Sequence, residues 1–221
     1  MSSKPPTYVY VDGFNLYYGC FKDSNRPHLA KYKWLDLQRF CDSLFPQNDV
    51  LKIKYYTADV YNRPPDNHQN DRQKAYLRAL SCLPRVEIIK GYFSHPKPVR
   101  MPLCDEQGNY LGKTVTVLKT EEKGTDVNLA VDLLYDAVLD KFKCAIIVSN
   151  DSDLVSPIRI AASQYNKLIG VANPQNTRPN KELSDACKLH FRIRESLLST
   201  CQLPESISIG TSMISRPAQW K

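Results

Sequence analysis

A chain of 221 residues with 42% hydrophobic residues is long enough for one substantial domain or at most two small ones. Its formal net charge of +7 permits a nucleic-acid partner without requiring one. No apolar run approaches the roughly 20 residues that cross a bilayer, and the first residues have no signal-peptide core. We therefore expect a cytoplasmic protein with no membrane partner.

The first half of the chain alternates apolar runs with amphipathic segments. Strands are expected where apolar or alternating residues cluster, and helices where apolar residues recur with a period near 3.6. In chain order the expected elements are a strand at 7–11, a helix at 14–21, a helix at 34–45, a strand at 50–58, a helix at 66–83 and a strand at 86–93.

An irregular stretch over 95–118 follows, and it contains several prolines. Gln107-Gly108-Asn109 predicts a hairpin turn between strands at 99–104 and 110–118. This insert is a candidate for selecting substrate or for forming a homodimer, and both interpretations stay open.

The second half returns to the alternating pattern. Expected elements are a helix at 125–139, a strand at 144–148, a helix at 153–165, a strand at 167–172, a helical turn at 181–186 and a strand at 189–193. This order predicts an α/β protein with a mainly parallel central sheet in three layers.

The domain organisation follows from these elements. We expect a disordered N-terminus over 1–6, one domain over 7–195 and a polar C-terminal tail over 196–221 that is loosely attached.

The seven cysteines are scattered, their number is odd, and no two form a Cys-x-x-Cys pair. A chain of this length does not need disulfide bonds to stabilise a small core. Zinc is disfavoured because His95 and Cys104 have no partners at ligand spacing. The sequence therefore predicts reduced thiols in core or surface positions.

Acidic residues stand where expected strands or loops give way to helices. Asp12 ends the first strand, Asp126 opens a helix, and Asp151 and Asp153 follow the strand at 144–148. The carboxyl ends of parallel strands are where α/β folds place their sites. Carboxylates gathered there would repel one another unless a cation held them together, which points to Mg²⁺ or Mn²⁺ and phosphodiester chemistry.

Asp126 is the carboxylate with the strongest support. It lies in the first turn of its helix, where the helix dipole favours negative charge. On a helical wheel it shares the apolar face and therefore points inward, whereas Asp132 and Asp136 fall on the polar side and are expected to be solvated. The other residues on the apolar face are Leu129, Ala130, Leu133, Leu134 and Ala137.

The other three carboxylates have competing structural explanations. Asp12 would serve equally well as an N-cap, although Gly13 after it allows a close backbone approach to a ligand. Of Asp151 and Asp153, one would cap the next helix. Because a helix needs a single capping side chain, the pair together with Ser149 and Asn150 is an excess that favours a metal ligand.

Basic residues are the candidates for tracking phosphate groups. Lys123 beside Asp126 would contact a phosphate or be solvated. The full set is Lys22, Arg26, Arg63, Arg72, Lys97, Arg100, Lys123 and Arg178.

Three segments together resemble the signature blocks of the NYN domain family, whose members are relatives of PIN-domain nucleases. They are Val-Asp-Gly-Phe-Asn-Leu from Val11, the segment 119–132 with Lys-Gly-Thr-Asp-Val-Asn at its centre, and Val-Ser-Asn-Asp-Ser-Asp-Leu from Val148. The resemblance covers about 7–195 and implies a PIN-like α/β/α fold and a metal-dependent ribonuclease site. A frequent family form has Gly where Asn150 stands, and this departure removes no ligand.

The resemblance also implies roles for single residues. The family's acidic positions match Asp12, Asp126, Asp151 and Asp153, which would act as catalytic residues and metal ligands. Asp132 matches a further position, but the helical wheel turns it away from Asp126. Substrate contacts are expected from Asn15, Lys123, Ser149 and Asn150.

The resulting hypothesis is an endoribonuclease dependent on Mg²⁺ or Mn²⁺ that hydrolyses RNA, single-stranded or structured. Two alternatives stay open. One is a regulatory module that binds RNA without turnover. The other is an enzyme of pyridine-derivative catabolism, because some proteins similar to this one are assigned there.

Overall fold

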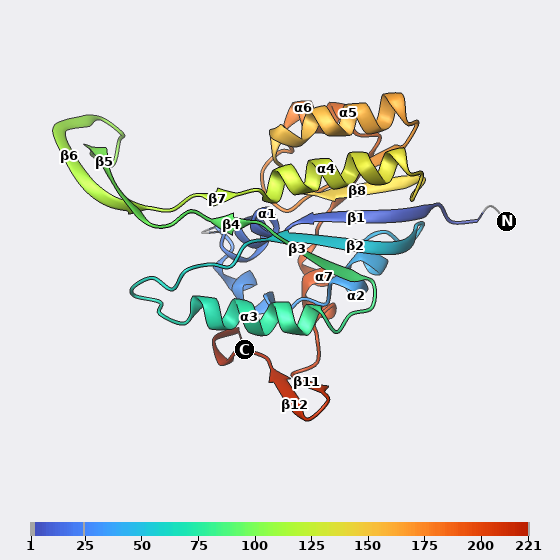
Figure 1. Cartoon of the computed structure of the whole chain (residues 1–221), viewed down its shortest axis with the longest axis horizontal. Helices are drawn as coiled ribbons and strands as arrows, with labels where there is room; N and C mark the ends of the chain where they lie inside the picture. Colours follow the sequence, from blue (N-terminus) through green and yellow to red (C-terminus); the bar gives the residue numbers. More distant parts are fainter. Residues whose placement is uncertain (1–2, 24, 221) are drawn as a thin grey trace.

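The computed structural model describes residues 3–23 and 25–220, and a six-stranded sheet forms its centre (Figure 1). All pairs in this sheet are parallel, and their order is β10-β9-β8-β1-β2-β3. The strands are β1 (Pro6–Asp12), β2 (Asp49–Thr57), β3 (Val86–Lys90), β8 (Cys144–Val148), β9 (Leu168–Asn173) and β10 (Leu189–Arg192). The predicted parallel sheet is confirmed.

Helices cover both faces of the sheet, so the predicted three-layer α/β/α fold is also confirmed (Figure 1). One face carries α4 (Thr125–Val138), α5 (Val155–Gln164) and α6 (Lys181–Ala186), and the other carries α2 (Leu37–Leu44), α3 (Gln69–Leu80) and α7 (Glu195–Thr200). No helix within the described residues is long and apolar enough to cross a lipid bilayer.

Alternate residues of each central strand feed the two cores. Val9 and Val11 pack in the cluster that contains Trp34 and Phe40, whereas Tyr10 packs with Leu129 in the cluster on the opposite face. Successive side chains of a strand point to opposite faces, and both faces of this sheet are covered. This is why β8 and the middle of β1, residues 8–11, do not alternate with charged residues.

Strand β1 lies at the point where the sheet reverses its order. The chain runs from β1 to β2 and β3 on one side, and then crosses to β8 and β9 on the other. Val11 is in register with Val148, so Asp12 and Ser149 leave the sheet side by side. Ligands of open α/β sheets bind in the crevice at such a reversal.

The segment after β1 bends away from the sheet in short helical turns. These are α1 (Gly13–Leu16), a π-helical turn (Tyr17–Phe21) and a 3₁₀ turn (Pro27–Tyr32). The expected helix at 14–21 is therefore split into an α and a π segment.

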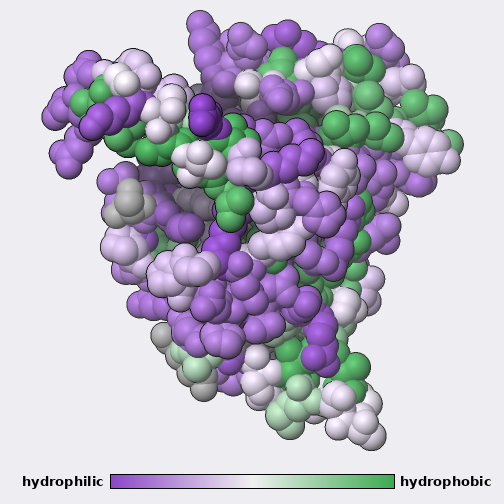
Figure 2. All heavy atoms as spheres, turned by 60° about the vertical axis from the view of Figure 1, so that its left-hand side comes forward, coloured by the Kyte–Doolittle hydropathy of each residue, from purple (hydrophilic) through white to green (hydrophobic). Residues whose placement is uncertain are grey.

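The predicted hairpin is present and projects from the domain (Figure 1). It consists of β5 (Lys97–Cys104) and β6 (Tyr110–Lys119), and a short pair, β4 (Tyr92–Phe93) with β7 (Glu122–Lys123), forms its base. Gly108 has a φ of +86°, and the Asp105 carboxylate accepts the N–H of Asn109 at 2.8 Å, which closes the turn. Figure 2 shows apolar side chains on this hairpin beside a largely hydrophilic surface.

The C-terminal segment corrects one prediction, because it is not loosely attached. It forms a small hairpin, β11 (Ser206–Ile209) with β12 (Ser212–Ser215), and then a 3₁₀ turn (Ala218–Trp220). Trp220 is 8% exposed, and its ring centroid lies 6.2 Å from that of Trp34. A few apolar anchors spread among polar residues hold the segment, and average polarity conceals them. Of the N-terminus expected to be disordered over 1–6, residues 1–2 lie outside the described residues, and β1 already includes Pro6.

Asp136 corrects a second prediction, because it is buried instead of solvated as the helical wheel indicated, whereas the Asp132 side chain is 30% exposed. Asp136 has no exposed surface; Tyr10 donates its hydroxyl to it at 2.9 Å, and the Lys54 ammonium lies 2.6 Å away. Asp132 accepts the Tyr56 hydroxyl at 2.8 Å. Burial opposes ionisation of Asp136, but hydrogen bonds from Lys54, Lys141 and Tyr10 outweigh it and lower its pKa. Tyr10, Lys54 and Tyr56 come from β1 and β2, which a helical wheel does not include.

The Asp136 network generates a stability prediction. Replacing Asp136→Ala leaves the Lys54 ammonium buried without its closest carboxylate, so we expect unfolding in urea to lose about 3 kcal/mol. Asp185→Ala, which removes an exposed carboxylate on α6, is the control and should change stability by less than about 0.5 kcal/mol. Equal midpoints for the two variants would contradict the assignment.

Candidate active site

A cleft of about 560 Å³ opens at the carboxyl ends of β1 and β8. Five segments line it: the turns after β1, strand β7, the start of α4, the loop after β8 and the loop after β9. The polar residues among the lining are Asp12, Asn15, Lys22, Asp23, Asn25, Glu122, Thr125, Asp126, Asp151, Gln175, Asn176 and Thr177. Three of the four predicted carboxylates therefore share this cleft.

Asp12 is held from two sides. One carboxylate oxygen accepts the backbone N–H of Asn15 at 2.9 Å, and the other accepts the hydroxyl of Ser149 at 3.0 Å. The side chain is 6% exposed, and burial raises its pKa, while the bonds from Asn15 and Ser149 act in the opposite direction. The two explanations for Asp12 are compatible, because it caps α1 and also lines the cleft.

Asp126 lies in the first turn of α4 and lines the cleft as the helical wheel indicated. Gly124 precedes the helix with a φ of +91°, a conformation that favours glycine. Burial, followed by the charges of Asp12 and Asp151, raises the pKa of Asp126 to about 6. Burial is the largest cause of the shift, and the neighbouring carboxylates add to it, so the charged form of Asp126 lacks a matching cation.

Asp151 has both roles that were expected for the pair Asp151 and Asp153, because it lines the cleft and also caps a helical turn. Asp151 lines the cleft, accepts the N–H of Asp153 at 3.0 Å and thereby caps the 3₁₀ turn Ser152–Leu154 that leads into α5. Asp153 is exposed and does not line the cleft. The structure thus brings Asp12, Asp126 and Asp151 together and leaves Asp153 at the rim.

The four residues predicted to bind substrate have different positions. Asn15 accepts the N–H of Asn150 at 3.1 Å, and Asn150 in turn accepts the N–H of Asn180 at 2.7 Å. Ser149 bonds to Asp12. These three side chains fix the loops around the cleft. Lys123 instead points to the surface, where its ammonium lies 2.8 Å from a carboxylate oxygen of Glu121. Lys123 does not line the cleft.

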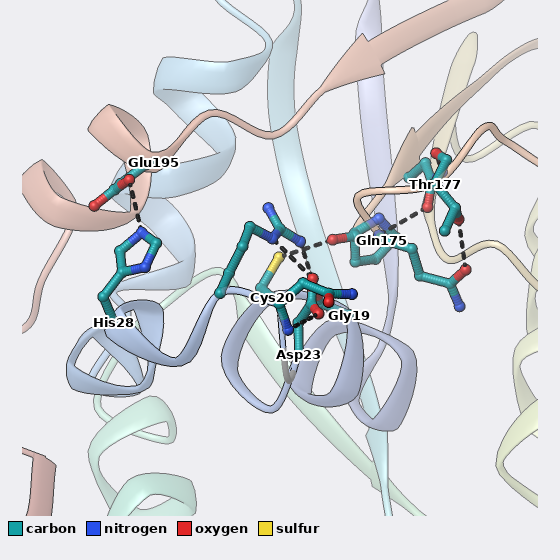
Figure 3. Close-up of polar contacts among 11 residues, drawn as sticks. Gly19, Cys20, Asp23, His28, Gln175, Thr177 and Glu195 are labelled. Carbon is teal, nitrogen blue, oxygen red and sulfur yellow. Dashed lines mark hydrogen bonds and ion pairs between the residues drawn. The ribbon is translucent and has the colours of Figure 1, made fainter.

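The loop after β9 completes one rim of the cleft through Gln175, Asn176 and Thr177, whereas the sequence had pointed only to Arg178 in this loop. Figure 3 shows Gln175 and Thr177 of this loop opposite Gly19 and Asp23 of the turns after β1. The thiol of Cys20 donates to the carbonyl of Pro174 at 3.4 Å, which joins the two rims. A signal was available, since Asn173-Pro174 ends a parallel strand next to β8.

Ion pairs and hydrogen bonds already engage several of the basic residues predicted to track phosphate. Arg26 donates to Asp23 at 2.9 Å and to the Gly19 carbonyl at 2.8 Å. Arg72 pairs with Asp66. Lys22 lines the cleft, with its ammonium 5.3 Å from the centre of the Tyr18 ring.

The spacing and the type of the possible ligands indicate whether the cleft suits Mg²⁺ or Mn²⁺. Within the described residues, no group of three or more His, Cys, Asp or Glu side chains lies at metal-binding spacing. The donor types do fit, because Asp12, Asp126 and Asp151 present carboxylate oxygens to one cleft, and hard cations prefer oxygen ligands. The raised pKa of Asp126 is the observation that favours a cation here.

A three-layer parallel fold with acidic residues at the carboxyl ends of its central strands is the architecture of PIN-like nucleases. The model of the NYN domain matches residues 6–195, and the chain belongs to the NYN domain family. This family is part of the PIN-like nuclease superfamily, and its nucleases generally depend on divalent metal ions.

Two similar proteins bear on the chain. It is 29% identical over 243 residues to 6-hydroxy-3-succinoylpyridine 3-monooxygenase HspA of Pseudomonas putida, covering 97% of this chain and 75% of that protein. A crystal structure of a protein of unknown function from Vibrio parahaemolyticus matches with a TM-score of 0.55 and 20% identity, covering 88% of this chain and 96% of that one. The second likeness supports the fold alone.

The raised pKa of Asp126 predicts how stability depends on pH. In the folded state the carboxyl has a pKa of about 6 against an ordinary 3.8, so ionisation costs stability as pH rises through this window. In EDTA, we expect Asp126→Asn to melt at a higher temperature than wild type above pH 6. The difference should vanish below pH 3.8.

Asp71→Asn is the matched control for this measurement. Asp71 also lies in the first turn of a helix, α3, but it is exposed. We expect this variant to gain no stability as pH rises. If the melting temperatures of Asp126→Asn and wild type differed by the same amount at every pH, the Asp126 carboxyl would not have a raised pKa in the folded state.

Proposed function

We propose that the protein is a metal-dependent endoribonuclease whose site is the acidic cleft at the ends of β1 and β8. One observation carries the proposal: in a chain of the NYN family, Asp126 faces Asp12 and Asp151 in an open cleft and has a pKa raised to about 6. Such a group of carboxylates is suited to holding a divalent cation against a phosphate backbone.

The residues of the chain have separate tasks in this proposal. Asp12, Asp126 and Asp151 would hold Mg²⁺ or Mn²⁺. The bound ion supplies Lewis acidity toward the phosphoryl oxygens and acidifies a coordinated water. Ser149 and the N–H of Asn15 keep the Asp12 carboxylate aimed into the cleft.

Substrate would be held by the rims of the cleft. Lys22 offers a cation to the phosphate backbone, and Gln175 and Thr177 offer hydrogen-bonding groups on the opposite side. The cleft of about 560 Å³ is open, which suits a chain that enters and leaves the site. RNA is the proposed substrate, and the projecting hairpin stays a candidate for selecting it or for joining two copies.

The test is cleavage of labelled single-stranded RNA by the purified chain with Mn²⁺. We expect internal cuts, and a loss of rate of at least about 100-fold in Asp126→Asn and in Asp12→Asn, because each change removes an anionic ligand. Asp153→Asn should cost less than about 10-fold, since its carboxylate lies outside the cleft.

Asp185→Asn is the control, because it removes a carboxylate that lies outside the cleft. This variant should cleave RNA at the wild-type rate. The same residual cleavage in wild type and Asp126→Asn would mark a contaminating nuclease and reject the proposal. Binding of RNA that weakens steeply with salt, without cleavage, would favour a regulatory module.

A second candidate function comes from one specific likeness. The similarity to 6-hydroxy-3-succinoylpyridine 3-monooxygenase HspA extends over 97% of this chain, so an oxygenase acting on a hydroxypyridine is the alternative. It predicts consumption of O₂ that depends on both a hydroxypyridine and a reduced nicotinamide. An oxygen electrode checks this, with product identified by mass, and no substrate-dependent uptake would exclude the alternative.

A further inference from the structure

A second cavity, here called the aromatic cavity, adjoins the acidic cleft. Its volume is about 130 Å³, and its wall includes seven aromatic residues: Phe14, Tyr17, Tyr18, Phe21, Tyr55, Tyr76 and Trp220. Phe14 and Tyr18 belong to the walls of both spaces, so the segment after β1 separates them. On its far side the cavity shares Lys33, Asp66 and Arg72 with a third, more open hollow.

Tyr55 presents an unused hydroxyl to this cavity. The residue is 7% exposed, and within the described part of the chain its hydroxyl has no hydrogen-bond partner. The neighbouring Tyr76 differs, because its hydroxyl donates to the carbonyl of Leu35 at 2.9 Å. The hydroxyl oxygen itself is not fully buried, so a ligand with a polar edge that enters the cavity can form a hydrogen bond with it.

The mouth of the cavity carries net positive charge. The Lys33 ammonium is half-buried, 5.3 Å from the centre of the Tyr17 ring, and burial followed by the nearby Arg72 lowers its pKa. Arg72 pairs with Asp66. Two cations against one carboxylate leave an excess that attracts an anionic group such as a phosphate.

Size limits what ring the cavity can hold. A protein cavity of about 150 Å³ accommodates benzene. The aromatic cavity of about 130 Å³ therefore suits one six-membered ring, and the two fused rings of a purine exceed it. Open hollows on both sides suit a ring that belongs to a longer chain, because the chain can continue in either direction.

We propose that the aromatic cavity is a base-selecting subsite that receives one unstacked pyrimidine of the RNA, with an adjoining phosphate at Lys33 and Arg72. Aromatic walls stack on the base, and the Tyr55 hydroxyl bonds to its polar edge. The position relative to the cut bond rests on the proposed ribonuclease function, whereas binding of the base does not require turnover.

The test is a titration of the wild-type chain in EDTA, followed by the fluorescence of Trp220 in the wall and Trp34 beside it. The probes are CMP, UMP, AMP and GMP, with nicotinate as a free monocyclic acid. We expect the pyrimidine nucleotides to bind at least about 10-fold tighter than the purine nucleotides.

Variants make the assignment specific. Tyr55→Phe should weaken CMP or UMP about 5-fold by removing one hydrogen bond, and Val60→Phe, which fills the cavity, should abolish their binding. Tyr165→Phe changes an exposed tyrosine at the end of α5, outside the cavity, and should leave the affinities unchanged. Circular dichroism at the assay temperature verifies that each variant is folded.

Three results would overturn the subsite: purines binding as well as pyrimidines, no effect of Tyr55→Phe and Val60→Phe, or nicotinate binding more tightly than any nucleotide. The last would make the cavity a site for a free aromatic acid. Pyrimidine binding without RNA cleavage would retain the subsite and reject the nuclease. Cleavage at purines and pyrimidines alike, unchanged by Tyr55→Phe, would retain the nuclease and reject the subsite.

Discussion

The hydrogen bond from the Ser149 hydroxyl to the Asp12 carboxylate joins β8 to β1 at the one place where the parallel sheet reverses its order. The same hydroxyl oxygen accepts the N–H of Asp151 at 3.1 Å. A single side chain therefore relates two of the three carboxylates of the cleft. Because Asp12 is nearly buried, it tolerates its charge only through such donors. The geometry of the site follows from satisfying this one group.

The central strands and α4 could be predicted because their signals are local. Cys144 to Val148 is a continuous apolar run, and β8 has the same bounds. Asp126 could be placed because it lies on the apolar stripe of its own helix. The sequence also predicted that one of Asp151 and Asp153 is a helix cap, but which of them has this role depends on the 3₁₀ turn Ser152–Leu154.

What could not be predicted depends on partners far along the chain. Asp136 is buried because β1 and β2 supply Tyr10 and Lys54 to it. Trp220 is buried because it meets Trp34, which is remote in the sequence but adjacent in the fold. An aspartate such as Asp136 is ordinarily exposed, and a tryptophan in a polar segment gives no clear signal of burial. In both cases the burial is determined by tertiary contacts that the local sequence does not contain.

Family membership limits the chemistry without selecting it. The NYN fold brings carboxylates to a sheet edge, yet a similar protein bears the name of a monooxygenase. A fold supports several activities, and the residues of the site decide between them. In this chain, the acidic cleft favours a cation and a phosphate, whereas the adjoining aromatic cavity favours a flat ring. A nucleotide chain is one ligand that has both features.

The β4–β7 pair at the base of the hairpin determines where this fold tolerates change. Tyr92 pairs with Lys123, and Phe93 with Glu122, so the two ends of the insert are held together before the chain reaches α4. Glu122 also accepts the N–H of Thr125 at 3.1 Å, which ties this base to the first turn of the helix. Residues can therefore be gained or lost between 94 and 121 without altering the distance from Asp126 to the sheet. The length of the hairpin is thus uncoupled from the geometry of the acidic cleft.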